Sequence, residues 1–459
     1  MRLLARAENC LFVAAGNAVL KADTASGAVT ILQVPADKCV GSDVLTLGLD
    51  EEQTHIYVGF SCKTLACFEM SSCKFVGCTT LRKRPAGVVA GSFPATALDR
   101  SADPEQLRTM VVVADNAGDI YALDAPNLRQ MAYVTGHTAT VLTDLELCVP
   151  SLGAGAGLRL VASADRDEKV RVSRFPDLET IQCFCLGHTS VVASVSFVRL
   201  GGAGGRDLLL SSGWDHKICL WDPLSGELLH SVVCAEGAEA EEAEVAVEEI
   251  AEEAGEASAS VEAAADAAGE GAAEGEGEGE GDADEEKKQY DEGSAGHYPH
   301  RVLGVTVGAE VLVAVIFKGL PLMKIYKCTQ AQSSSGAGLA LEELQTQSLH
   351  APAVDVVCIP GSATSAPQLA VLLPKPHGLQ LLDLSLSGAL TLSAVSGTFV
   401  AALVAAADSL GFDFALPAGS AGADQPTGMK KHTLDKRFNS AENIDCRIKR
   451  GSKRSKKKR

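Results

Sequence analysis

One stretch near the middle of the chain decides its fold. It opens with Gly187-His188, continues to Lys217-Ile218-Cys219-Leu220-Trp221-Asp222 and ends at Val232. Four short apolar runs lie within it, at residues 191–198, 208–211, 217–222 and 227–232, with turn residues between them. Runs of this kind predict four β-strands that form one unit.

The spacing of this unit is that of a WD repeat, the four-stranded blade of a β-propeller. Four of its residues occupy the positions of a hydrogen-bonded tetrad in such repeats: Trp221, Ser211, His188 and Asp215. A buried histidine needs a partner for each ring nitrogen, so the tetrad persists best when it is complete. We therefore interpret His188 and Asp215 as structural residues and not as an acid/base pair.

Weaker copies of the unit predict an all-β propeller. Gly136-His137 opens one copy, with Ser163 and Asp167 at tetrad positions and Ser173 in place of tryptophan. Further copies are marked by Asp115 with Tyr121, by Phe68, by Tyr326 and by residues 354–392. Residues 10–34 and 398–416 hold only partial copies, and we expect them to pair in one blade that joins the two chain ends. Seven blades are expected, with six as the alternative.

Charge is unevenly distributed over the 459 residues, which carry a net charge of −19 and are 46% hydrophobic. Residues 236–292 hold 23 acids and two lysines, and residues 430–459 hold 13 basic residues and three acids. Subtracting their net charges of −21 and +10 leaves −8 for the remaining residues. The acidic stretch lacks the apolar area that offsets ordering entropy. We predict a disordered insert at residues 235–294, a spacer or an acidic partner-binding element. It separates propeller parts at residues 1–234 and 295–427, and a disordered basic tail covers residues 428–459.

The cysteines indicate a reducing compartment, because the 14 thiols lie singly and no Cys-x-x-Cys pair occurs. We expect neither a metal site nor a secretory signal, since charges interrupt the first eight residues. Residues 384–407 carry no charge and are long enough to span a membrane. Recurring Ser, Thr and Gly residues and a period-two pattern favour two buried strands there, so we predict no membrane association.

No catalytic motif is recognisable. The sequence has no GxSxG, no P-loop, no HExxH and no glycine fingerprint between a strand and a helix. A propeller enzyme would need clustered carboxylates or histidines at the channel mouth, which we do not find. We therefore predict a non-catalytic protein without a cofactor of its own.

One hairpin is more charged than a strand turn requires. Residues 164–173 read Ala-Asp-Arg-Asp-Glu-Lys-Val-Arg-Val-Ser, and six of the ten are charged. Asp167 aligns with Asp215 and so has a structural explanation. Arg166, Glu168 and Lys169 are expected to project from the turn with mixed signs, which suits a protein partner better than a polyanion. From the residues alone, a solvated turn and a docking surface both remain open.

This hairpin, followed by Phe184-Cys185-Leu186-Gly187-His188-Thr189, resembles one WD-repeat family. The family is the non-catalytic subunit of the eukaryotic tRNA (guanine-N7-)-methyltransferase. The match is very close over residues 162–173 and 184–189, fair over 113–121, and also visible at 419–424. The chain departs from the family in its long acidic insert and in Arg174-Phe175, which stands where the family has a tryptophan.

The resemblance implies a heterodimer. In this family the propeller docks beside a Rossmann-like subunit that carries S-adenosylmethionine and the active site, stabilises it, and helps to hold tRNA so that the variable-loop guanine reaches it. Carried over by position, Glu168 and Arg171 are expected to form salt bridges to the catalytic subunit, with Arg166 and Lys169 beside them. The alternative is a generic WD scaffold, such as a substrate adaptor of a ubiquitin ligase or a subunit of a chromatin complex.

The last residues form a basic cluster. It comprises Lys449, Arg450, Lys453, Arg454, Lys456, Lys457, Lys458 and Arg459. Such a cluster is typical of a nuclear localisation signal and also of a phosphate-binding arm. Because no aromatic residues are interleaved, any RNA contact should be non-specific and salt-sensitive. We expect nuclear import, with RNA binding by the same arm compatible.

Overall fold

A computed structural model describes the chain from residue 2 to residue 409. Residues 36–37, 40–41, 98–100, 102, 104, 135, 138–139, 149–157, 202–204, 235–296, 334–335, 362–365, 376, 385–389 and 393–397 within this range are not described. The predicted acidic insert and the predicted basic tail lie outside the described residues.

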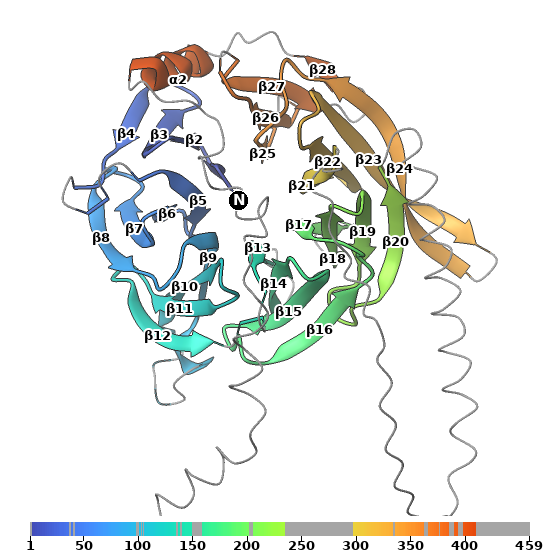
Figure 1. Ribbon diagram of the computed structural model, residues 1–459, viewed down its shortest axis with the longest axis horizontal. Helices are drawn as coiled ribbons and strands as arrows, with labels where there is room; N and C mark the ends of the chain where they lie inside the picture. Colours follow the sequence, from blue (N-terminus) through green and yellow to red (C-terminus); the bar gives the residue numbers. More distant parts are fainter. Residues whose placement is uncertain are drawn as a thin grey trace, which may run out of the picture. The chain divides into compact units, whose positions relative to one another are not determined.

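The described residues form seven antiparallel sheets, each built from four strands that follow one another in the chain. The sheets stand around a common centre as the blades of a propeller (Figure 1). The prediction of a WD-repeat propeller with seven blades is confirmed.

The blades have these bounds. Blade 1 contains β1 (Leu4–Ala7), β2 (Cys10–Ala15), β3 (Ala18–Asp23) and β4 (Val29–Leu32), and blade 2 contains β5 (Val44–Leu49), β6 (His55–Phe60), β7 (Thr64–Glu69) and β8 (Phe75–Thr80). Blade 3 contains β9 (Pro85–Pro94), β10 (Leu107–Asp115), β11 (Ile120–Asp124) and β12 (Arg129–Val134), with a short 3-10 helix at Ala95–Ala97. Blade 4 contains β13 (Leu142–Leu147), β14 (Arg159–Asp165), β15 (Lys169–Phe175) and β16 (Ile181–Leu186).

The last three blades follow the same order. Blade 5 contains β17 (Val192–Leu200), β18 (Arg206–Gly213), β19 (Lys217–Trp221) and β20 (Leu228–Val233). Blade 6 contains β21 (Pro299–Val307), β22 (Glu310–Phe317), β23 (Leu322–Ser333) and β24 (Gly336–Ser348). Blade 7 contains β25 (Asp355–Ile359), β26 (Gln368–Leu372), β27 (Leu379–Leu384) and β28 (Leu390–Leu392), and helix α2 (Thr398–Ser409) follows it.

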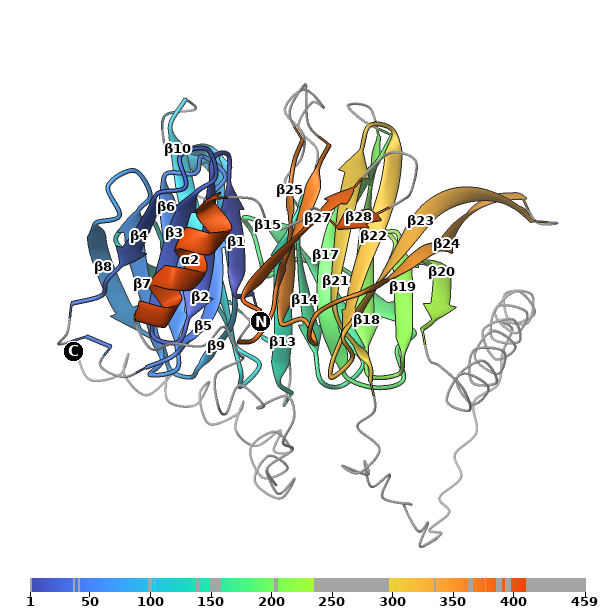
Figure 2. The same cartoon turned by 90° about the horizontal axis from the view of Figure 1, so that it is seen from above.

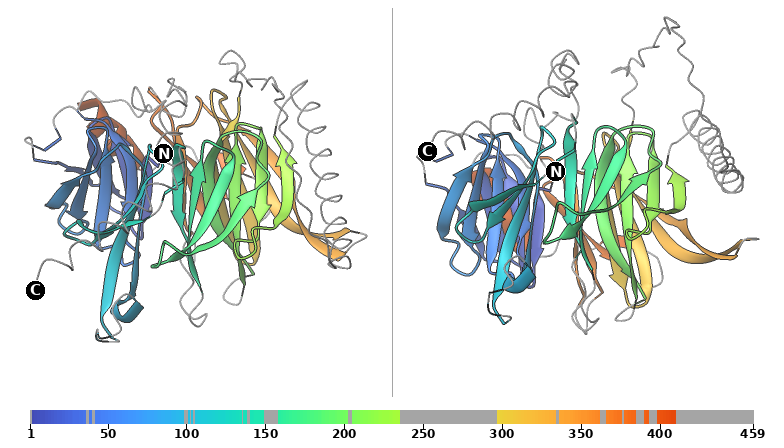
Figure 3. Two further views of the ribbon diagram at one scale, coloured as in Figure 1. Left: turned by 60° about the horizontal axis from the view of Figure 1, so that its bottom comes forward. Right: turned by 90° about the horizontal axis from the view of Figure 1, so that it is seen from below.

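The hydrophobic core lies between neighbouring blades. Between blades 4 and 5, for example, Val170 and Val172 of β15 join Leu209 and Trp221 in one fully buried cluster. Similar clusters join the other pairs of blades, and the largest of them extends over blades 7, 1 and 2 and helix α2. Burying one such side chain contributes about 1.5–3 kcal/mol. These side chains are buried between blades, so each blade depends on its neighbours for this stabilisation. The sheets stand side by side in the two views of Figure 3.

The ring closes differently from the prediction. The N-terminal strands form a complete blade by themselves, since Leu4–Ala7 supplies the innermost strand β1. Residues 398–409 form helix α2 and add no strand to blade 1, and residues 410–416 of the expected copy lie outside the described residues. The ring is completed where β1 contacts β25, and α2 packs against β3 and β4 at the outer side of blade 1 (Figure 2). The sequence analysis missed β1 because Arg2 precedes this strand and Arg6 lies within it, so the segment does not resemble an apolar run. Leu4, Ala5 and Ala7 of β1 are nevertheless buried.

Within the uncharged stretch at residues 384–407, the described residues belong to the end of β27, strand β28 and helix α2, and the helix contradicts the expectation of a strand at residues 398–407. Among the described residues, no helix is long and apolar enough to cross a membrane.

Candidate functional site

The two segments that carry the family resemblance form neighbouring strands of blade 4. The charged hairpin is built from β14 and β15, and the Phe-Cys-Leu segment lies at the end of β16. In the β15–β16 register Lys169 is opposite Leu186, and Arg171 is opposite Phe184. Residues opposite each other in an antiparallel pair point to the same side of the sheet. The fold therefore combines both segments on one face.

Asp165 anchors the hairpin turn. Its carboxylate lies 2.7 Å from His137 Nδ1 and accepts a 3.0 Å hydrogen bond from the Lys169 amide, while His137 Nε2 lies 2.7 Å from Ser163 Oγ. The prediction that Asp167 takes this position, copied from the spacing of Asp215, was wrong. Asp165 stands at the end of β14 and faces inward, whereas Asp167 is exposed in the turn.

The predicted docking residues of the turn lie at the surface. Arg166 is 3.4 Å from Asp167 in an ion pair, with both side chains more than a third exposed. Lys169 is exposed and Glu168 is partly exposed. Glu168 has a backbone φ of +72°, which turns the chain sharply at this point. Surface pairs of this kind contribute little to stability, so these charges are available to a partner.

Arg171 is placed differently from its three neighbours in the prediction. It is only 4% exposed, and its guanidinium donates hydrogen bonds to Ser173 Oγ (3.0 Å), the Gly136 carbonyl (3.3 Å) and the Leu178 carbonyl (3.2 Å). Ser173 is opposite Val161 in blade 4, as Trp221 is opposite Leu209 in blade 5. Ser173 therefore stands at the position of the missing tryptophan, and the Arg171 guanidinium donates to it. A salt bridge from Arg171 to another subunit stays a prediction.

Sequence reasoning missed the apolar part of this face. Phe184 is 43% exposed and Leu186 is 61% exposed, although both are large and apolar. We call these two exposed apolar residues of β16, Phe184 and Leu186, the rim patch. Gln182 Nε2 donates a 2.7 Å hydrogen bond to the Leu224 carbonyl, which holds blades 4 and 5 together here. The alternation Phe184-Cys185-Leu186, with only the cysteine buried, was the available signal.

The tetrad residues of blade 5 form one continuous hydrogen-bonded chain. Trp221 Nε1 donates to Ser211 Oγ at 2.8 Å, Ser211 Oγ lies 2.7 Å from His188 Nε2, and His188 Nδ1 lies 3.0 Å from Asp215. Burial by itself lowers the pKa of His188, but Cys219 and Asp215 outweigh it and raise this pKa to about 10. Burial raises the pKa of Asp215, and the charge of His188 more than reverses that shift. Both groups are therefore held in their charged forms.

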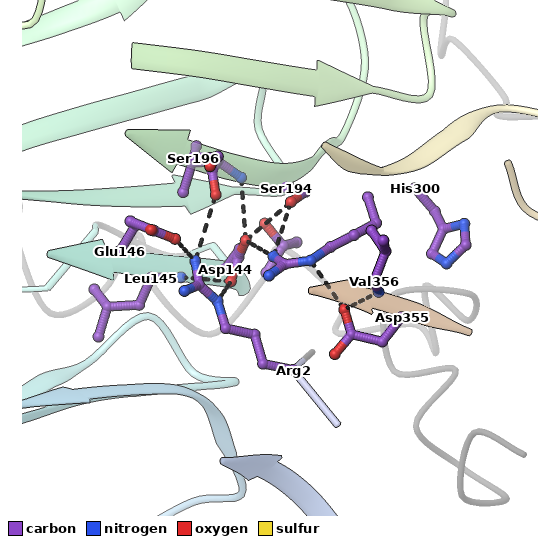
Figure 4. A network of polar contacts seen from close by, with 12 residues as sticks. Arg2, Asp144, Leu145, Glu146, Ser194, Ser196, His300, Asp355 and Val356 are labelled. Atoms are coloured by element: carbon purple, nitrogen blue, oxygen red, sulfur yellow. Dashed lines mark hydrogen bonds and ion pairs between the residues drawn. The ribbon is translucent and has the colours of Figure 1, made fainter. Parts of the chain in front are cut away.

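A buried polar network joins blades 1, 4, 5, 6 and 7 at the inner wall of the ring, with blade 5 included through Ser194 (Figure 4). Asp144 of β13 accepts hydrogen bonds from Arg301 Nη1 at 3.0 Å and from Arg2 Nε at 3.3 Å. Arg301 Nε also donates to Asp355 at 3.1 Å, and Asp355 accepts the amides of Leu3 and Leu4 at 2.7 and 2.8 Å. Burial raises the pKa of Asp144, but Arg2 and Arg301 outweigh it and hold the pKa below its usual range. No sequence pattern indicated this network.

The same inner wall borders a cavity of about 420 Å³. Arg2, Arg6, Glu51, Glu146 and Arg301 line it together with apolar residues of β1, β5 and β9. The acidic and basic side chains are mixed, and several already pair with one another. Among the described residues no group of three or more His, Cys, Asp and Glu side chains is placed to hold a metal ion.

Known proteins resemble this chain in the region of the hairpin. The family model described as tRNA methyltransferase TRM82 WD40 domain matches residues 124–270. The family resemblance is confirmed. This chain is 34% identical over 120 residues to the Aedes aegypti tRNA (guanine-N(7)-)-methyltransferase non-catalytic subunit wuho, covering 26% of this chain and 27% of that relative.

Two further relatives carry the same description. The Xenopus laevis subunit wdr4 is 34% identical over 123 residues, covering 27% of this chain and 28% of the relative. The Debaryomyces hansenii subunit TRM82 is 29% identical over 193 residues, covering 41% and 39%. The chain thus matches between about a quarter and two fifths of the length of these relatives.

Solved structures support the fold. One chain of the mitotic checkpoint complex matches with a TM-score of 0.52 at 13% identity, covering 84% of this chain and 90% of that chain. The WD40 repeats of RRP9 match with a TM-score of 0.50 at 14% identity, covering 80% and 84%. Likeness at this level of identity concerns the propeller alone.

Proposed function

We propose that this chain is the non-catalytic WD-repeat subunit of a tRNA (guanine-N7-)-methyltransferase heterodimer. Its catalytic partner carries S-adenosylmethionine and the active site. The propeller stabilises that partner and helps to position tRNA for formation of N7-methylguanosine in the variable loop. The observation that carries the proposal is the pairing of the two family-like segments in one partly exposed face of blade 4. The relatives' description as non-catalytic subunits supports a separate catalytic chain.

The chemistry of this face favours a protein partner. Lys169 and Leu186 are both exposed and stand opposite each other, and Glu168 adds a charge of the other sign. Protein interfaces combine large apolar side chains with charges that fix orientation. A nucleic-acid surface would instead need a predominance of basic residues. The rim patch and the turn therefore suit the catalytic subunit, and tRNA contacts lie elsewhere in the complex.

The four predicted residues have different roles in this interface. Glu168 and Lys169 form charged contacts with the catalytic subunit, and Arg166 stands at their edge. Arg171 holds β15 in place from beneath through its contacts with Ser173 and the Leu178 carbonyl. A direct salt bridge from Arg171 to the partner requires that the guanidinium leave some of these contacts, and it is tested below.

Leu186→Asp tests the surface, with Leu107→Asp as the matched control. The two leucines are equally exposed, at 61% and 60%, but Leu107 begins β10 in blade 3. Because truncating a central interface residue costs at least about 2 kcal/mol, we expect the dissociation constant for the purified catalytic subunit to rise roughly thirtyfold in Leu186→Asp alone. Methylation of tRNA should fall with it. Equal affinity in both variants would reject this face as the interface.

A pull-down from cell extract tests the alternative function. Recovery of a methyltransferase together with tRNA supports the proposed function. Recovery of cullin-type components or histones in its place would support a scaffold or substrate adaptor.

We also propose that the complex acts in the nucleus and that residues 448–459 direct its import. The support is the density of Lys and Arg in this segment, which is typical of import signals. The segment lies outside the described residues, so its test is cellular and is given below.

A further inference from the structure

Two cysteines from different parts of the chain meet at the start of blade 2. Cys39 lies between β4 and β5, and Cys62 lies in the turn between β6 and β7. Their sulfur atoms are 3.6 Å apart. The neighbouring backbone joins the same two segments, because the Ser61 amide donates to the Asp43 carbonyl at 2.8 Å and the Asp43 amide donates to Ser61 Oγ at 3.1 Å. The two thiols are therefore held close together by the fold.

The two thiols have different reactivities. Cys62 is exposed, and its Sγ lies 3.3 Å from Thr64 Oγ1. Burial raises the pKa of the Cys62 thiol, but hydrogen bonds with Ser42, Thr64 and Cys39 outweigh it and lower this pKa below its usual value. Burial and the contact with Cys62 raise the pKa of Cys39 to about 11. An accessible thiol with a lowered pKa beside a thiol with a raised pKa is the arrangement of a redox-sensitive pair.

We propose that Cys39 and Cys62 are an oxidative modification site, where a hydroperoxide converts the two thiols into a reversible disulfide. The Cys62 thiolate attacks the peroxide oxygen, which breaks the O–O bond, forms a sulfenic acid and releases hydroxide or alkoxide. Cys39 then attacks the sulfenic sulfur, its thiol proton passes to the departing hydroxyl group, the S–O bond breaks, and the new S–S bond and water form. The peroxide accepts the two electrons that the thiols lose. A dithiol reductant reverses the step by thiol–disulfide exchange.

Other described thiols are less suited to this step. Cys67, Cys148, Cys219 and Cys234 are buried, and a buried thiol is inert to oxidants. Cys183 and Cys185 share one strand at positions i and i+2, where extended backbone keeps their Cα atoms about 6.6 Å apart. That distance is near the upper limit for a disulfide. Cys39 and Cys62 join separate segments, so a bond between them would tether the loop before β5 to blade 2.

Peptide mapping tests the proposal on the full-length protein. Lys38 and Lys63 are the tryptic sites that flank the pair, so both cysteines fall in one peptide, residues 39–63. After hydrogen peroxide and then N-ethylmaleimide, this peptide should appear unalkylated and two hydrogens lighter. Dithiothreitol before alkylation should return it to the doubly alkylated form. The peptide 75–82 with the half-buried Cys78 serves as the internal reference and should stay alkylated.

Two variants test the order of events. In Cys39→Ser we expect a sulfenic acid at Cys62 that dimedone traps, because the resolving thiol is gone. In Cys62→Ser we expect Cys39 to remain alkylatable at the same peroxide concentration. Oxidation of Cys39 in the second variant at the wild-type rate would overturn the proposal. So would a wild-type protein in which Cys62 proceeds to sulfinic acid without the cross-linked peptide, or in which Cys78 oxidises as fast.

Discussion

Arg171→Leu separates a structural role of this residue from a direct role in partner binding. The substitution removes hydrogen bonds to Ser173 Oγ, the Gly136 carbonyl and the Leu178 carbonyl, and two of these three bonds are buried. A buried acceptor that loses its donor costs about 1–3 kcal/mol. We therefore expect the free energy of unfolding of the isolated chain to fall by about 2–4 kcal/mol.

Urea unfolding measures this loss. Trp214 and Trp221 are the two tryptophans of the chain, and both lie in or next to blade 5 beside the altered blade. Their fluorescence should report a lower urea midpoint for Arg171→Leu. Arg174→Leu is the matched control on the same strand, because Arg174 is exposed and its Nε donates to Gln182 at the surface. We expect its free energy of unfolding to change by less than about 0.5 kcal/mol.

Affinity for the catalytic subunit is measured on the same two variants. We expect Arg171→Leu to weaken association together with stability, because β15 carries Lys169. If Arg171→Leu unfolds at the wild-type midpoint and association alone is lost, the guanidinium acts on the partner and its structural role is refuted. If neither quantity changes, the hydrogen bonds of Arg171 carry no net free energy.

Three further predictions concern the ring and the tail. Asp144→Asn leaves Arg2 and Arg301 short of a buried counter-charge, so we expect unfolding to become about 3–5 kcal/mol easier. Asp207→Asn removes a partly exposed partner of Arg199 and should change the free energy of unfolding in urea by less than about 1 kcal/mol. Equal losses in Asp144→Asn and Asp207→Asn would contradict the prediction that the buried ion pairs contribute more. For the His188–Asp215 pair, the pKa of His188 rises from 6.5 to about 10 on folding, so its stabilisation is complete below pH 6.5 and declines as the pH rises toward 10. The stability difference between wild type and Asp215→Asn should therefore be larger at pH 6.5 than at pH 10, and a pH-independent difference would show that the pair is uncharged. Deletion of residues 448–459 should move a fluorescent fusion from the nucleus to the cytoplasm, and an unchanged distribution would discard the import signal.

Much of the fold could be predicted because each repeat is formed by residues that are close together in the chain. Strand runs and turn residues recur every few tens of residues, the Trp221–Asp222 pair marks one complete unit, and each blade is a local hairpin series. Blade 7 at residues 355–392 agrees closely with the expected unit at 354–392. The failures lie at the chain ends, where a strand with charged residues at its edges and an alanine-rich helix have no repeat to align with.

The candidate site was predicted in part. The charged turn and the Phe-Cys-Leu segment were found by resemblance, but their side chains could not be placed. Arg166, Glu168 and Lys169 lie at the surface, whereas Arg171 turns inward because Ser173 leaves room and a polar partner. Whether a residue on a strand is exposed depends on the neighbouring blade, which local periodicity does not contain.

By itself, the sequence determined that the chain is a WD-repeat propeller with one complete tetrad, because hydrogen bonds and strand alternation within a blade join residues close in the chain. Tertiary structure alone decided how the ring closes and which groups share a surface. Arg2 meets Asp144, and the amide of Leu3 meets Asp355, across 142 and 352 positions. Contacts over such separations are set by the packing of whole blades, and no short pattern of residues records them.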